Sequence, residues 1–170
     1  MGESSKYIDQ FSDLHTAKKL GMPAPHKAVL LLSIIDLIER GCVTSNRIEL
    51  TEQLEQTFGH VWKRYVGTSI VFQPKVATPF WHMQGEPFWN LYLNNDKELD
   101  SITNPYSVKR LRESTHAIID ADLFRLMQDE NERAKLRVVL ISTYLQHQIP
   151  SVDKTLAIVV MLNTLFNIAA

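Results

Sequence analysis

The stretch PHKAVLLLSIIDLIERG, Pro25 to Gly41, decides the fold. Its middle, Val29 to Ile35, is apolar on nearly every helical face, which is typical of a buried helix at the centre of a domain. Pro25 stands where a helix begins and needs no N–H donor, and Gly41 is well suited to end one. The pattern therefore predicts a central helix, around which the other elements pack.

A short strand and a second helix follow this central helix. Asn46 to Leu50 alternates polar and apolar side chains, as a strand does, and Thr51 can cap a helix that runs to about Tyr65. The inward face of that helix carries Leu54, Phe58, Val61, Trp62 and Tyr65, and the outward face carries Gln56, His60, Lys63 and Arg64. Outward side chains of these kinds contact bases and phosphates in DNA-binding helices, and they are also common on any solvated helix.

The stretch QPKVATPFWHMQGEPFWNLYL, Gln73 to Leu93, contains the tripeptide Pro-Phe-Trp twice, at 79–81 and 87–89. Alternating side chains after each proline predict two strands joined by a turn at 84–86, and hence a hairpin near 78–93. Helix, strand, helix and hairpin is the order of a winged helix. We therefore predict an α+β, mainly α-helical fold with a winged-helix-like core, a small antiparallel sheet and C-terminal helices.

The flanking segments predict further helices within a single domain of residues 1–170, whose 45% apolar content suffices for a sizeable core. Helical spacing predicts a first helix from Ser4 or Ser5 to about Leu20, ended by Gly21. Downstream, helices are predicted over 107–112, 118–127 and 132–146, and a last apolar helix over 152–170. That last segment either closes the core or forms an association surface.

Charge is segregated along the chain, although the formal net charge is only −1. No acidic residue lies between Asp13 and Asp36 or between Glu55 and Glu86, and a third basic run falls at 109–112. Such windows fit a cationic face that attracts polyanions. They fit equally well a set of solvated helix faces that never converge.

The sequence offers no recognisable catalytic or cofactor chemistry. Cys42 is the single cysteine, the six histidines lack metal-ligand spacing, and there is no phosphate-binding glycine loop or nucleophile turn. The N-terminus is too polar for a signal peptide, and the most apolar tract is too short to span a bilayer. We expect a cytoplasmic binding module with no catalytic residue, metal or cofactor.

Four motifs, taken in order, resemble the sulfur-binding domain of McrA-like type IV restriction endonucleases: PAPHKAVLLLSIIDLIERG, NRIELTEQLEQTF, TPFWHMQ and PFWNLYL. The resemblance covers Gly21 to about Leu93. It implies sequence-context-dependent binding of double-stranded DNA that carries phosphorothioate linkages, as the recognition module of a bacterial modification-dependent restriction system. Such domains are typically joined to an HNH nuclease domain, and no HNH motif is present in this sequence.

The same resemblance places the sulfur and phosphate contacts at Pro79, with Thr78 and Phe80 beside it, and at the pair His26 and Lys27. Some relatives carry an aromatic residue where this chain has Thr78. Contacts to flanking phosphates or base edges are expected from Lys63, Arg64, Lys75, His82 and Arg47.

Three other interpretations stay open at the level of sequence. The first is a winged-helix DNA-binding or regulatory module that ignores backbone sulfur. The second is a helical interaction domain that forms a homodimer through its apolar C-terminal tract. The third is an enzyme, which would need a metal site that the sequence does not show.

Overall fold

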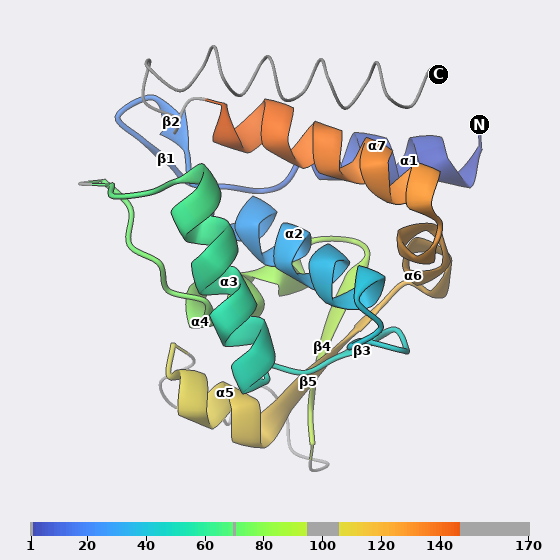
Figure 1. The fold of residues 1–170 in the computed structure, drawn as a ribbon. Coiled ribbons are helices and arrows are strands. Elements are labelled where there is room, and N and C mark those ends of the chain that lie inside the picture. Colours follow the sequence, from blue (N-terminus) through green and yellow to red (C-terminus); the bar gives the residue numbers. More distant parts are fainter. Residues whose placement is uncertain (1, 70, 95–105, 147–170) are drawn as a thin grey trace.

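The computed structural model describes residues 2–69, 71–94 and 106–146 of the 170-residue chain. Helix α2, His26–Glu39, runs through its centre, and every residue from Lys27 to Ile35 is buried (Figure 1). The helix ends at the predicted glycine: Gly41 has a φ of +70°, and its N–H donates to the Ile38 carbonyl at 3.0 Å. The predicted central helix is confirmed.

Further helices pack around α2. Helix α3, Glu52–Tyr65, begins at Thr51, whose side-chain oxygen accepts a hydrogen bond from the Leu54 N–H at 3.1 Å. Its buried and exposed faces are those that the sequence predicts. Helices α6 (Ala121–Gln128) and α7 (Glu130–Leu140) also pack on α2, and α1 (Glu3–Ser12) packs against α6 and α7. Helix α7 continues into one π-helical turn, η3 (Ile141–Leu145).

A small antiparallel sheet lies beside α2. Its strands are β3 (Arg47–Ile48), β4 (Trp89–Leu93) and β5 (Thr115–Ile119), in the spatial order β3-β5-β4. Ile118 of the middle strand stands opposite both Arg47 and Asn90. Alternate side chains of β4 and β5 are buried, so one face of the sheet belongs to the core. The predicted α+β, mainly helical class with a small antiparallel sheet is confirmed.

The predicted hairpin near 78–93 is wrong in its first strand. Residues Ala77–His82 form a short helix, α4, followed by a 3-10 turn, η1 (Met83–Gly85), so only the second Pro-Phe-Trp leads into a strand. Phe80 and Met83 are both fully buried while His82 is exposed, which is a helical spacing rather than the alternation of a strand. Pro79 lies in the first turn of α4, where a missing N–H donor costs little. Without this hairpin, no wing exists in the described part of 78–93.

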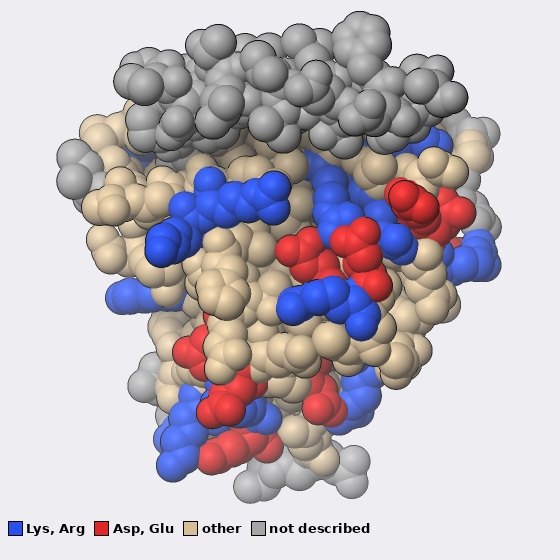
Figure 2. All heavy atoms as spheres, in the orientation of Figure 1, with Lys and Arg blue, Asp and Glu red and all other residues tan. Residues whose placement is uncertain are grey.

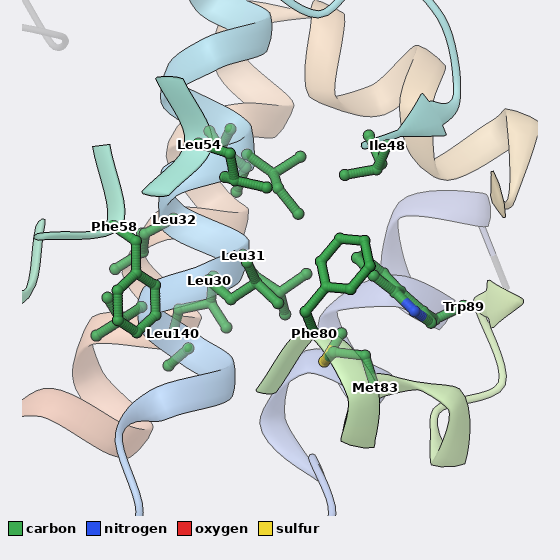
Figure 3. Packing of buried hydrophobic residues seen from close by; sticks show 14 of the residues in the cluster. Leu30, Leu31, Leu32, Ile48, Leu54, Phe58, Phe80, Met83, Trp89 and Leu140 are labelled. Atoms are coloured by element: carbon green, nitrogen blue, oxygen red, sulfur yellow. The ribbon is translucent and has the colours of Figure 1, made fainter. Parts of the chain in front are cut away.

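Burial explains why the aromatic repeat is not symmetric. The ring of Phe80 meets the ring of Trp89 edge-on, with 5.4 Å between their centroids, and Figure 3 shows the Phe80 ring between Leu31 of α2 and Trp89. The first Pro-Phe-Trp thus supplies a helical segment that covers the sheet, and the second supplies the strand itself. The tryptophan of the strand and both phenylalanines are scaffold.

The predicted first helix is too long, because α1 ends at Ser12 rather than near Leu20. Beyond it, the N–H of Leu14 donates to the Tyr144 hydroxyl at 2.7 Å, and the N–H of His15 donates to Glu86 at 3.0 Å. These partners, which are distant in the sequence, accept hydrogen bonds from backbone N–H groups that a longer helix would otherwise have paired. The spacing of nearby residues cannot predict such contacts. The chain then forms a small hairpin from β1 (Lys18–Lys19) and β2 (Met22–Pro23), and β1 lies where the end of the first helix is predicted.

The C-terminal predictions have mixed outcomes. The basic segment is helical as predicted, in α5 (Val108–Ser114), and so is the segment from 132 onward. The predicted helix over 118–127 is wrong at its start, since Ile118 and Ile119 belong to β5 and α6 begins at Ala121. The predicted helix over 152–170 lies outside the described residues. In the described ranges, no helix has the length and apolar character needed to cross a membrane.

Candidate nucleic-acid interface

Two of the acid-free segments come together at one edge of the molecule. The ammonium of Lys19 donates to the Val71 carbonyl at 3.3 Å, and Nε2 of His26 lies 2.7 Å from the Gln73 carbonyl. The β1–β2 hairpin, the first turn of α2 and the loop after α3 are therefore neighbours (Figure 1, left). We call this region the basic edge, defined by Lys18, Lys19, His26, Lys63, Arg64 and Lys75.

The lysines and the arginine of the basic edge are not paired with carboxylates. Within the described residues, Lys18, Lys19, Lys63, Arg64 and Lys75 form no ion pair, and all five are exposed. Elsewhere, positive and negative side chains are interspersed, as the face of α2, α3 and α7 shows (Figure 2). There Arg137 contacts both Asp36 and Glu39 at 2.5 and 2.7 Å. Exposed and unpaired cations are the groups that exchange counterions for DNA phosphates.

Arg47 does not belong to the basic edge. It lies on β3, and its Nε donates to Glu49 at 2.8 Å. In Figure 1, β3 stands on the opposite side of the molecule from the β1–β2 hairpin. Of the predicted DNA contacts, Lys63 and Arg64 lie in the last turn of α3 and Lys75 lies in the loop that follows it, whereas Arg47 lies apart. Arg64 also lines a hollow with Asp36 and Glu39, on the face between α2, α3 and α7.

His26 is held in an aromatic niche at the head of α2. Its ring lies 4.9 Å from that of Trp62 and 5.8 Å from that of Phe72, measured between centroids. Burial lowers the pKa of His26 below its usual value, and the hydrogen bond to the Gln73 carbonyl opposes this in part. The neutral ring donates through Nε2 and leaves Nδ1 without a proton. Nδ1 can therefore donate to an anion only when the ring takes up a proton.

Lys27 points into the protein. Its residue is only 7% exposed, and its ammonium donates to Glu86 at 2.5 Å. Glu86 is itself buried and also accepts from the N–H of His15. The pair joins the first turn of α2 to the residue that follows η1. The two neighbours at which the resemblance places sulfur and phosphate contacts are therefore in different surroundings: His26 lies at the basic edge, and Lys27 is buried.

An open cleft of about 740 Å³ lies beside the start of α4. Its wall is largely apolar where Phe58 and Val76 line it, and the charged or polar side chains in its lining are Glu55, Lys75, Thr78, His82 and Tyr106. Pro79, the next residue along α4, is buried, and Phe80 is fully buried in the core. Thr78, Lys75 and His82 thus meet at one opening, with Pro79 adjacent in the chain.

Some residues of the cleft escape prediction from local sequence. Tyr106 and Val108 line it from the α5 side, and the Tyr106 hydroxyl lies 3.3 Å from Nε2 of His82. No short-range pattern connects positions so far apart in the chain. Lys18 and Lys19 had a visible signal, the acid-free window, but their hairpin was not foreseen.

Comparison with known protein families matches residues 4–155 to the family described as ScoMcrA-like, DNA sulfur-binding domain. The chain belongs to this family. The resemblance seen in the four motifs is thereby confirmed, and DNA sulfur binding is established at the level of the family. The matched range contains the basic edge, the cleft and Pro79. A comparison with curated proteins returned no relative.

The sulfur-binding-domain family is a family of binding modules, which agrees with the predicted non-enzymatic role. Within residues 2–69, 71–94 and 106–146, no three His, Cys, Asp or Glu side chains gather in a way that could hold a metal ion.

Proposed function

We propose that this sulfur-binding domain recognises phosphorothioate-modified double-stranded DNA at the start of α4, with the basic edge holding the flanking phosphates. The observation that carries the proposal is the largely apolar cleft at Thr78, whose lining includes the exposed, unpaired Lys75 and one carboxylate, Glu55, which is paired with Arg112. The domain would act as the recognition module of a cytoplasmic modification-dependent restriction system. Cleavage would then belong to an HNH nuclease domain or partner.

The chemistry of sulfur supports an apolar contact. A non-bridging sulfur is larger, more polarizable and a poorer hydrogen-bond acceptor than the oxygen it replaces. Methyl and ring C–H groups suit it, whereas an oxygen there would lose its water without gaining a donor, at about 1–3 kcal/mol. Since ~1.4 kcal/mol is a factor of ten, this gives roughly tenfold to hundredfold discrimination. Pro79 and the methyl group of Thr78 would supply the contact.

The remaining site residues divide into contacts and supports. Lys75 and His82 at the cleft, together with Lys63 and Arg64 at the end of α3, would contact phosphates or base edges. His26 would contact a phosphate in its protonated form. Lys27, paired with Glu86, and Phe80, packed on Trp89, would hold α2 and α4 in their relative positions.

Equilibrium binding to two duplexes that differ only in one phosphorothioate linkage tests the proposal. Tighter binding of the modified duplex, by tenfold or more, supports sulfur recognition. Salt-dependent binding of equal strength to both duplexes would instead support a second candidate, a DNA-binding module that ignores sulfur. The burial of Pro79 favours that candidate, because a buried ring presents little surface to a ligand.

A single lysine of the cleft should tune affinity without changing the preference for sulfur. Lys75→Ala removes one exposed cation, so modified and plain duplexes should both bind several-fold more weakly. The slope of log K against log salt should fall by about one. The measurement is a salt titration of binding for both duplexes. Lys135→Ala on α7, whose cation is paired with Glu132 at 2.7 Å, is the matched control and should leave the slope unchanged.

Binding should strengthen as the pH falls, because His26 takes up a proton when a phosphate approaches it. Burial keeps the pKa of His26 low in the free protein, and an adjacent anion raises it in the complex. At a pH between the pKa of His26 in the free protein and its pKa in the complex, binding is accompanied by proton uptake. The affinity therefore rises as the pH falls from about 8 towards 5.5. His26→Gln keeps a side-chain N–H for the Gln73 carbonyl and should flatten the profile. An identical pH profile in both proteins would remove His26 from the site.

A further inference from the structure

Leu20 is the most exposed large apolar side chain among the described residues. It is 80% exposed, whereas Tyr106, the next, is 53% exposed. Leu20 belongs neither to the buried core nor to the side chains packed against it. It stands at the tip of the β1–β2 hairpin, between Lys19 and Gly21.

The backbone at this tip is also unfavourable for leucine. Leu20 has a φ of +52° and Gly21 a φ of +78°, as in the tight two-residue turns that prefer Asn-Gly. Leucine in the left-handed region is strained, because its Cβ crowds the backbone. Glycine adopts a positive φ without strain at position 21, whereas leucine at position 20 does not. A strained residue with no contact in the folded protein suggests a role in binding.

The surroundings of the tip indicate a polyanionic partner. Lys18 and Lys19 flank it on β1, are exposed, and form no ion pair within the described residues. The hydrogen bond from Lys19 to the Val71 carbonyl attaches the hairpin to the loop that carries Lys75. The hairpin therefore projects from the basic edge, next to the proposed phosphate contacts.

We propose that the β1–β2 hairpin enters the major groove of the bound duplex and that Leu20 packs there against the 5-methyl group of a thymine near the modified linkage. This inference rests on the proposed function. The major groove is roughly 12 Å wide and admits a two-stranded β-ribbon. An apolar side chain is the natural partner of the thymine methyl, which is the one apolar group among the base edges of that groove. Lys18 and Lys19 then face the phosphates on its rims. Leu20 would thus contribute to the dependence on flanking sequence.

Two substitutions separate binding from folding. Leu20→Asn places the favoured residue in the turn, and Leu20→Gly removes the side chain altogether. Both relieve the backbone strain, so the melting temperature should rise by about 2–4 °C. Both should bind the modified duplex about tenfold more weakly than the wild type. Val138→Asn, which alters an exposed apolar residue of α7, is the matched control and should leave binding unchanged.

The DNA side of the contact is tested with a duplex that carries A·T pairs on both sides of its phosphorothioate linkage. Thymines within one helical turn are replaced singly by deoxyuridine, which lacks the methyl group. One replacement should weaken the wild type several-fold and leave Leu20→Gly unaffected. The inference is overturned if both Leu20 variants bind within twofold of the wild type, or if the wild type tolerates every replacement. Failure of the proposed function is a separate result: the wild type would bind plain and modified duplexes equally.

Discussion

Replacing Lys27 by methionine should lower the free energy of unfolding by about 3–5 kcal/mol. The substitution removes the lysine cation from the buried Glu86, which keeps only the N–H and the ring of His15 as partners, at 3.0 and 3.4 Å. A buried carboxylate that loses its cation is strongly destabilising. The long apolar stem of Lys27 is replaced by one of similar volume, so lost packing contributes little. Urea denaturation at neutral pH measures the change.

The double variant Lys27→Met with Glu86→Leu distinguishes a structural role of Lys27 from a direct contact with phosphate. Replacing both partners of a buried pair by apolar side chains is often neutral, so most of the lost stability should return. If Lys27 only supports the site, the double variant keeps DNA binding. Loss of binding in a stable double variant would restore Lys27 as a direct phosphate contact. A cost below about 1 kcal/mol for the single variant would mean that water reaches the pair.

Pro79→Ala should abolish the preference for modified over plain duplex, a change of roughly tenfold to hundredfold. The pyrrolidine ring would be lost as an apolar contact for sulfur, while the cations of the basic edge remain. Weak, salt-sensitive binding to both duplexes should therefore persist. Alanine is well tolerated in the first turn of α4, so the fold should survive. Parallel titrations of both duplexes measure the ratio of their dissociation constants.

Pro87→Ala is the matched control for this experiment. Pro87 begins the second Pro-Phe-Trp, is exposed, and lies outside the cleft beside α4. The control should keep the wild-type preference. If Pro79→Ala also keeps the full preference, the sulfur contact lies elsewhere on the domain.

Local patterns were sufficient for the central part of the fold. Three features depend only on neighbouring residues: the apolar run of α2, the glycine that ends it, and the cap at Thr51. The structure confirms all three. The repeated Pro-Phe-Trp led to a wrong prediction of two strands, because the first tripeptide lies in helix α4 and the second leads into strand β4. Phe80 and Met83 share a helical spacing, which the alternation around Trp81 and His82 concealed.

The candidate site is less predictable than the fold, because distant residues decide which side chains reach the surface. In the sequence, His26 and Lys27 are both basic residues of the first helical turn. In the structure, the side chain of Lys27 is buried because it pairs with Glu86, which is distant in the sequence. The acid-free windows predicted a cationic region, and the structure joins two of them through Lys19 and His26. The resemblance to a family supplied the ligand class, which composition and spacing alone could not identify.

The most direct test of sulfur recognition is a competition experiment on the wild-type domain. A labelled duplex with one phosphorothioate linkage is displaced by its unlabelled modified form or by the plain duplex of identical sequence, at two salt concentrations. We expect the plain competitor to be at least tenfold weaker at both concentrations, because discrimination arises from an apolar contact and the salt-sensitive phosphate contacts are common to both duplexes. Equal competition by the two duplexes would contradict recognition of sulfur at this site.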